Sequence, residues 1–398
     1  MTDRTLTSLR RLPTLIAAAG LLVAACSGTG PILANPALVL PAPPTAAPTP
    51  SPIPDPVAIH LPGDDAPHDR LTEWWYYTGH LVATDGRHFG FEAVIFRAER
   101  GSVPTTWASH LALTDAAGNR FLYAQRSQVG GPVAIPQRVL GGQTGFDLNV
   151  TGFDPSDPSS VLQMPWTLVG GGGRDKITAA LSPKEAATAG GSFGLALDLQ
   201  SEKPAALHGA NGWIDFGPAG SSYYYSRTRM AISGSLSLDG ATLAVTGTGW
   251  FDHQWGDFIS VGGGGWDWFA VELADGSDLT LSIVRAADGT FPLVYGTYVD
   301  KAGATTHLAA EAFTVRSTGS WTSPKTGATY PAGWQIGVPS QGLVIDLTPT
   351  VADQELDTRP STGVVYWEGS QRVTARRSGQ PVSGEAYVEL TGYATAKP

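Results

Sequence analysis

The sequence is poor in cysteine, poor in charged residues and free of long apolar segments. A single cysteine among 398 residues excludes a disulfide framework, a cysteine-ligated zinc site and a C-x-x-C redox pair. Charged residues make up 15% of the chain, with a formal net charge of -10, so no basic surface for a nucleic acid is expected. Motifs of phosphate-binding loops, dinucleotide-binding folds and H-E-x-x-H metalloproteases are also missing.

Glycine and aromatic residues are abundant instead, with 49 Gly, 12 Trp, 12 Tyr and 13 Phe. Apolar and polar residues alternate with a period of two in several segments, which predicts half-buried strands. Examples are residues 193–200, 232–238, 278–283 and 385–390. Turn sequences such as Asp239-Gly240 separate these segments. We predict an all-β protein of two consecutive antiparallel β-barrels, because closure removes the exposed edges of roughly eighteen strands.

The N-terminus has the features of an export signal. Arg4, Arg10 and Arg11 precede an apolar run, 15–25, that is too short to span a bilayer. The run leads into Val-Ala-Ala-Cys-Ser, which resembles the bacterial lipoprotein box, in which the cysteine, here Cys26, is acylated. The prediction is a signal peptide at 1–25 and an extracytoplasmic lipoprotein of the cell envelope, anchored to a membrane through Cys26. An ordinary secretory peptide with an incidental cysteine is the alternative.

Residues 26–56 predict a linker. Ten prolines fall between Pro31 and Pro56, and no charged residue occurs from Ser27 to Pro54, a composition that favours an extended spacer over a packed core. The folded part then divides into an N-terminal domain, 57–260, and a C-terminal domain, 261–398. We place the join near Phe258 to Gly263, where a run of glycines follows the densest aromatic cluster.

Two aromatic segments hold the candidate functional residues. In the first, 73–80, large aromatic side chains point to both faces of a predicted strand. Such a strand lies between a core and either a ligand cavity or a neighbouring domain. The candidate ligand-binding residues of this segment are Glu73, Trp74, Trp75, Tyr76 and His80.

The second aromatic segment, 249–257, continues to a Trp-Asp-Trp-Phe sequence at 266–269. Apolar walls shift pKa values and can keep a carboxyl group protonated, as a general acid requires. The candidate catalytic residues are Asp252, His253, Trp255 and Asp267, with Trp266 and Trp268 as cavity walls. Alternate residues of an extended chain point to opposite sides, so Asp252 and His253 do not share a face. The alternative is structural, with tryptophans that fill a core and an Asp-His hydrogen bond beside a turn.

The histidines show no spacing typical of a metal site. His80, His88 and His110 fall in separate predicted strands without an H-x-H pair, and we predict neither a metal nor another cofactor. Four more histidines fall in predicted loops and are expected to face solvent: His60, His68, His208 and His307.

Four motifs of the folded part occur together. They are EWWYYTGHL at 73–81, YYSRTRM at 224–230, GWFDHQWG at 249–256, and YWEG at 366–369 with 384–393. This combination resembles the AttH/CrtC family, which includes carotenoid 1,2-hydratase (hydroxyneurosporene synthase), kievitone hydratase and bacterial proteins labelled as secreted hydrolases. The resemblance runs from about residue 67 to residue 394 and implies two consecutive lipocalin-like barrels.

The resemblance also implies a hydratase of the CrtC type that needs no cofactor. A general acid protonates an isoprenoid alkene, aromatic faces hold the tertiary cation, and water adds. In family hydratases the implicated His and Trp match His253 and Trp255, whereas the later acid matches Asp267 or Asp278. Tyr225 joins the ligand-binding candidates through the Tyr-Tyr-Ser motif. The alternatives are a non-catalytic carrier of a small hydrophobic ligand and a secreted hydrolase.

Overall fold

The computed structural model describes residues 55–101, 103–130, 137–139, 143–152, 164–209, 211–258 and 263–394. The predicted signal peptide, Cys26 and nearly all of the predicted linker lie outside these ranges. Strands make up 65% and helices 6% of the structure, so the prediction of an all-β protein is confirmed. Within the described ranges, no helix has the length and apolar character needed to cross a membrane.

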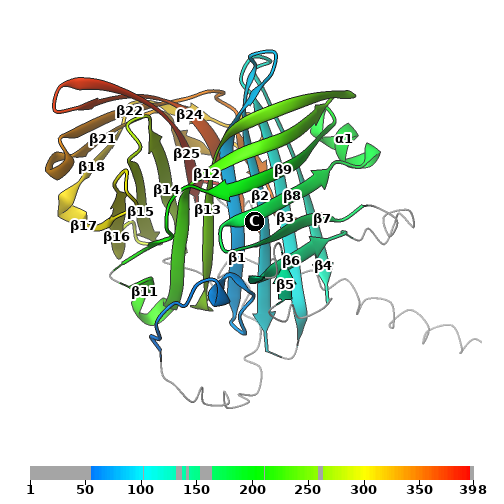
Figure 1. Ribbon diagram of the computed structural model, residues 1–398, viewed down its shortest axis with the longest axis horizontal. Coiled ribbons are helices and arrows are strands. Elements are labelled where there is room, and N and C mark those ends of the chain that lie inside the picture. Colours follow the sequence, from blue (N-terminus) through cyan, green and yellow to red (C-terminus); the bar gives the residue numbers. More distant parts are fainter. Residues whose placement is uncertain are drawn as a thin grey trace, which may run out of the picture.

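The first antiparallel sheet has thirteen strands in the described part of the chain (Figure 1). They are β1 (Thr72–Ala83), β2 (His88–Arg100), β3 (Val103–Asp115), β4 (Arg120–Val129), β5 (Gln137–Val139), β6 (Gln143–Val150), β7 (Trp166–Gly171), β8 (Arg174–Ala180), β9 (Phe193–Ser201), β10 (Ala206–Leu207), β11 (Trp213–Asp215), β12 (Gly220–Leu238) and β13 (Ala241–Phe258). Their order is β4-β3-β2-β1-β13-β12-β9-β8-β7-β6-β5, with β10 and β11 paired to β12. Because β3 and β4 also contact β6, the sheet curls toward closure.

The second antiparallel sheet has ten described strands, and a two-stranded ribbon of β19 and β20 accompanies it. The strands are β14 (Gly263–Leu273), β15 (Asp278–Ala286), β16 (Leu293–Val299), β17 (Thr305–Ala309), β18 (Thr314–Ser317), β19 (Ser320–Thr322), β20 (Thr329–Pro331), β21 (Trp334–Val338), β22 (Leu343–Pro349), β23 (Glu355–Asp357), β24 (Val365–Arg377) and β25 (Gln380–Thr391). The sheet order is β17-β16-β15-β14-β25-β24-β22-β21-β18, with β23 paired to β24. The helices are α1 (Pro183–Ala189) and the short 3-10 turns η1 (Gly63–Asp65), η4 (Gly217–Ala219), η5 (Ala310–Ala312) and η6 (Pro339–Gln341).

Each sheet curls around an apolar core of its own, as two consecutive lipocalin-like barrels do. In β9 the predicted alternation holds, because Phe193, Leu195, Leu197 and Leu199 are buried in the first core. The Asp239-Gly240 turn joins β12 to β13 with φ angles of 48° and 86°. Positive φ at both positions is typical of the two-residue hairpin that this dipeptide predicts.

The two sheets lie side by side (Figure 1) and meet along β1, β2 and β12 of the first sheet and β14, β15, β24 and β25 of the second. Nearly all of β1 and the C-terminal half of β13 are buried on both faces. The two-sided aromatic strand thus lies between the first core and a neighbouring barrel. The first sheet ends at Phe258 and the second begins at Gly263, whereas residues 259–262 lie outside the described part.

Candidate functional site

Pairing of β1, β13 and β12 arranges the candidate residues in rows across the sheet. In one row, Trp75 lies opposite His253, and His253 lies opposite Tyr225. In the next row, Tyr76 lies opposite Asp252, which lies opposite Ser226. The first row faces the core of the first barrel, and the second row faces the other sheet. The predicted separation of Asp252 from His253 follows from this alternation.

On the inter-sheet face, three donors surround the carboxylate of Asp252. It accepts hydrogen bonds from Tyr224 Oη at 2.6 Å, from Trp250 Nε1 at 2.6 Å and from the hydroxyl of Ser226. Burial raises the pKa of Asp252 to about 6, and these hydrogen bonds oppose the rise. His208 lies behind Ser226, with its Nε2 atom 2.6 Å from Ser226 Oγ. Asp252 is therefore a buried acid with a fully formed hydrogen-bond shell.

Three further carboxyl groups lie at the junction of the two sheets. Glu92 of β2 accepts a hydrogen bond from Tyr366 Oη at 2.7 Å, and Glu368 of β24 lies opposite Glu389 of β25. Burial is the main cause that raises the pKa of Glu92 to about 8, that of Glu389 to about 7 and that of Glu368 well above its usual range. No Lys or Arg is among the groups that shift these three pKa values. Burial therefore favours the protonated form of these carboxyl groups.

Several polar atoms of this glutamate cluster have no hydrogen-bond partner among the described residues. They are Tyr76 Oη, Glu92 Oε2 and both carboxyl oxygens of Glu368. Tyr76 nevertheless lies close enough to Glu368 to lower the pKa of Glu368 in part, against the effect of burial. Glu368 is 0% exposed and Glu92 is 1% exposed. Because buried polar atoms nearly always have partners, these atoms mark a place for a water molecule or a polar group of a ligand.

Aromatic side chains from both sheets surround this face. Tyr76 packs edge-on against Trp268, with ring centroids 5.5 Å apart, and Trp250 packs in the same way against Trp268 at 6.0 Å. Trp74 and Trp266 are half-buried at the border of the same cluster. The inter-sheet face thus combines buried carboxyl groups of raised pKa with aromatic walls.

On the barrel-facing side, His253 belongs to a different network. Its Nε2 atom lies 2.9 Å from Glu73 Oε1, and the same oxygen lies 2.8 Å from His68 Nδ1. The ring of His253 stacks on Trp75, and that of His68 stacks on Trp255. Burial lowers the pKa of His253 more than Glu73 raises it. Burial acts to raise the pKa of Glu73, but hydrogen bonds from His253 and His68 outweigh it and hold that pKa low.

The structure divides the predicted site residues between the two faces of the first sheet. Trp74, Tyr76, His80, Asp252, Trp266 and Trp268 lie at the junction of the sheets, and Glu73, Trp75, Tyr225, His253 and Trp255 face the first barrel. Asp267 joins neither group, because strand alternation turns it away from its neighbours Trp266 and Trp268. It forms an ion pair with Arg285 and accepts a hydrogen bond from Tyr393.

Sequence reasoning missed several residues of the site. Glu92, Glu368 and Glu389 were not among the candidates, although Glu368 stands in the YWEG motif between aromatic and glycine residues. The expectation that His208 faces solvent is wrong, because its side chain is 0% exposed and lies between Ser226 and Thr297. His68 is half-buried, whereas His60 and His307 are exposed as expected.

With the fold and both networks described, comparison with known families becomes informative. A family model described as AttH-like matches residues 52–393. The chain belongs to the AttH-like family. The resemblance in the sequence is thereby confirmed. Comparison with curated protein sequences gives no match.

Two solved structures support the assignment of this AttH-like protein. An AttH protein from Nitrosomonas europaea shares 30% identity, covers 87% of this chain and 100% of its own, and superposes with a TM-score of 0.70. Kievitone hydratase from Nectria haematococca shares 18% identity over 85% of this chain and 94% of its own, with a TM-score of 0.59. The second likeness shows the fold. Together they support a hydratase-like or hydrolase-like fold.

Proposed function

We propose that this AttH-like protein is a cofactor-independent hydratase that adds water to a C=C bond of an apolar, isoprenoid-like substrate at the junction of its barrels. The observation that carries the proposal is the cluster of Glu92, Glu368 and Glu389, whose pKa values are raised by burial. Both oxygens of Glu368 and Oε2 of Glu92 also lack a hydrogen-bond partner among the described residues. Shared architecture with kievitone hydratase favours hydration among the reactions that this fold could host.

Glu368 is the best-placed general acid, because neither of its oxygens has a partner at ordinary hydrogen-bond geometry among the described residues, and only Tyr76 lies close enough to interact with it as a donor. Its proton adds to one alkene carbon, and the tertiary cation forms beside the new carboxylate. Aromatic faces such as those of Trp250 and Trp268 stabilise a desolvated cation by about 2 kcal/mol. Water then bonds to the cationic carbon and returns a proton to Glu368. The sum is addition of H and OH without a redox step.

His253 and Trp255 contribute from the other face of β13. Both side chains pack in the barrel-facing network, so they do not touch a substrate at the junction. We assign them a positioning role, because they fix the part of β13 that presents Trp250 and Asp252 to the second sheet.

Glu368→Gln tests the hydratase proposal. The full-length protein is incubated with lycopene in detergent micelles, in water enriched in heavy oxygen, and products are analysed by mass spectrometry. We expect a tertiary alcohol that carries the label, and a rate reduced by about 100-fold or more in the variant, because general acid catalysis contributes roughly that much. Glu311→Gln, at an exposed position, is the matched control. Equal rates for the wild type and Glu368→Gln would contradict the proposal, and binding without turnover would favour the carrier.

We also propose that Cys26 anchors the protein to a membrane of the cell envelope, where apolar substrates dissolve. The sequence of residues 1–27 supports this. A Cys26→Ala variant is expected to stay unprocessed and to leave the membrane fraction. Correct cleavage together with undiminished membrane binding would refute the lipid anchor.

A further inference from the structure

The barrel-facing network of His68, Glu73 and His253 has no direct part in the proposed hydration. The three residues come from different segments: the stretch before β1, the start of β1 and the middle of β13. We infer that they form a binding site for a divalent transition-metal ion of the zinc class. The ligand atoms are His68 Nδ1, Glu73 Oε1 and His253 Nε2, which lie within 4.8 Å of one another. Two imidazoles and one carboxylate leave a fourth position for water around such an ion.

The three ligand atoms already lie close to the separations found around a zinc ion, so metal binding requires little movement. Glu73 Oε1 lies 2.8 Å from His68 Nδ1 and 2.9 Å from His253 Nε2. Zinc–ligand bonds of about 2.0–2.2 Å place pairs of ligands roughly 3–4 Å apart. To bind the ion, the two contacts of Glu73 Oε1 would lengthen slightly. The two imidazole nitrogens would also have to lie within roughly 4 Å of each other. His68 can move for this purpose, because its side chain is 20% exposed.

A neutral His253 cannot donate a hydrogen to both of the groups that its ring nitrogens contact. Tyr225 donates its single hydroxyl hydrogen to Asp65, whose carboxylate also accepts from Arg227 at 2.9 Å. The 3.3 Å contact between Tyr225 Oη and His253 Nδ1 therefore needs a hydrogen on Nδ1. In a neutral ring, Nε2 then presents a lone pair to Glu73 Oε1 at 2.9 Å.

The other tautomer of His253 satisfies one contact of the ring but leaves the other without a hydrogen. A hydrogen on Nε2 satisfies Glu73, but it leaves Nδ1 and Tyr225 Oη as two acceptors that face each other. A doubly protonated ring satisfies both contacts but places a positive charge on a side chain that is 0% exposed. A metal ion on Nε2 resolves the conflict, since Nδ1–H then donates to Tyr225.

Each proposed ligand also has the partner that metal ligands usually have in the next layer. Asp64 Oδ1 lies 3.6 Å from His68 Nε2, and Tyr225 lies at His253 Nδ1. The backbone N–H of His68 donates to both oxygens of Glu73, at 3.0 Å to Oε2 and 3.2 Å to Oε1, and Arg97 Nη1 lies 3.7 Å from Oε2. Carboxylate and hydroxyl partners of this kind orient imidazole ligands and raise their affinity.

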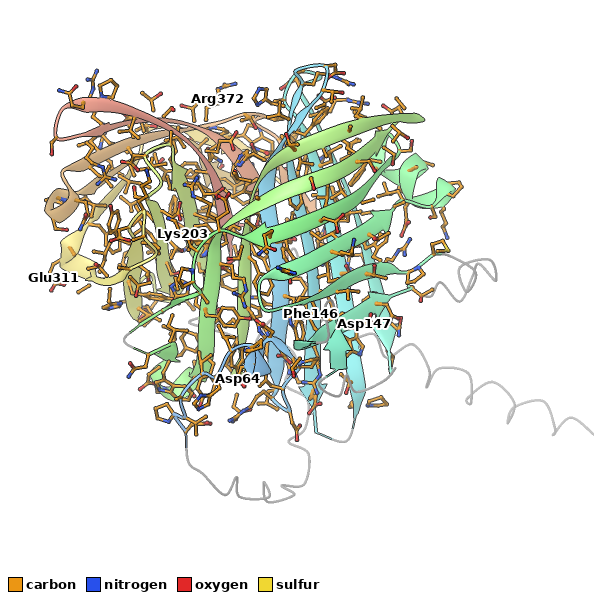
Figure 2. The ribbon with its side chains drawn as sticks, viewed as in Figure 1. Asp64, Phe146, Asp147, Lys203, Glu311 and Arg372 are labelled. Carbon is orange, nitrogen blue, oxygen red and sulfur yellow. The ribbon has the colours of Figure 1, made fainter. Side chains whose placement is uncertain are left out.

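An ion at this place has a route of entry and a structural consequence. Asp64, labelled at the lower end of the first sheet in Figure 2, has a side chain 30% exposed and lies next to His68 at the rim. Since His68 precedes β1, a bound ion would fasten this N-terminal stretch to β1 and β13. We therefore expect the metal to raise the stability of the first barrel.

The test measures zinc binding by the full-length protein. The chain is freed of metal by a chelator, equilibrated with Zn²⁺ and analysed for bound metal, with affinity measured by competition against a chromophoric chelator. One zinc per chain is expected for the wild type. His68→Gln, at the rim, and Glu73→Gln are each expected to weaken binding by more than about 100-fold, since loss of second-layer partners alone costs 10–100-fold. His60→Gln, an exposed histidine of the same segment, should leave affinity unchanged.

Two further measurements, the absorption spectrum of bound Co²⁺ and the melting temperature, distinguish loss of metal binding from misfolding of a variant. Co²⁺ should give visible absorption bands in the wild type and in His60→Gln, and lose them in His68→Gln. The melting temperature should rise with Zn²⁺ concentration in the wild type and in His60→Gln but not in His68→Gln, because binding to the folded state is what raises stability. Folded His68→Gln that binds zinc as tightly as the wild type, or wild type that binds none, would overturn the inference.

Discussion

Single carboxyl groups define the chemistry of the junction between the barrels. Among the described residues, no Lys or Arg pairs with Glu92, Glu368 or Glu389 there, whereas the buried Asp65 is bound by Arg227. Burial without a counter-charge favours the neutral form of a carboxyl group. A neutral carboxyl group has a proton to give to an apolar alkene, whereas an ion-paired carboxylate has none.

The pH dependence of the free energy of unfolding tests whether Glu92 is neutral in the folded protein. Its pKa is about 8 in the folded protein against an ordinary value of 4.5. A raised carboxyl pKa gives stability that is fully present below the unfolded pKa and is lost as pH rises through the folded pKa. Glu92→Gln has no proton to lose, so its stability relative to the wild type should improve between about pH 5 and pH 8, by about 2 kcal/mol or more.

Thermal or urea denaturation at the two pH values measures this difference, with Glu311→Gln as an exposed control. A stability difference between Glu92→Gln and wild type that stays constant over the range would show that Glu92 is already ionised in the folded protein.

At the scale of elements, strand alternation predicted on which face of β1 and β13 each side chain lies, but not what packs against that face. The rule that neighbours point to opposite sides correctly separated Asp252 from His253. The same rule excludes Asp267 from the face of Trp266 and Trp268, although the sequence analysis grouped them. Glu389 looked like the solvent face of a half-buried strand, because nothing local reveals that a second sheet covers that face.

A second element-scale feature is the ion cluster that ties β12 to β15. Asp278 is 0% exposed and receives Lys203 Nζ at 2.6 Å and Arg229 Nη2 at 2.6 Å. Both cations come from the first sheet's part of the chain, and Figure 2 labels Lys203 where the two sheets adjoin. Asp278 thus joins the barrels, and its role is structural.

Asp278→Asn should destabilise the protein strongly. Removing one partner of a buried cluster leaves uncompensated charge and costs about 3–5 kcal/mol. Asp198→Asn is the matched control, since Asp198 pairs with Lys176 at side-chain exposures of 61% and 51% and such pairs contribute about 1 kcal/mol or less. Urea denaturation compares the two, and equal losses would mean that the Asp278 cluster does not hold the barrels together.

For the whole molecule, the sequence predicted the two-barrel architecture but not which distant segments come together inside it. Period-two segments and Asp-Gly turns were enough to predict two consecutive barrels, because both signals are local. The approach of His68 to His253, and of Glu92 to Glu368, depends on contacts between segments more than 180 residues apart in sequence. Such contacts leave no periodic signal, so a histidine before β1 looked like a surface residue.

Infrared difference spectroscopy of wild type against Glu368→Gln and Glu92→Gln at neutral pH tests the central claim most directly. Protonated carboxyl groups absorb apart from carboxylates, and the account predicts that the protonated-carboxyl band of the wild type weakens in each variant. A spectrum in which each substitution removes only a carboxylate band would show that the junction holds charged glutamates, and the proposed acid catalysis would be contradicted.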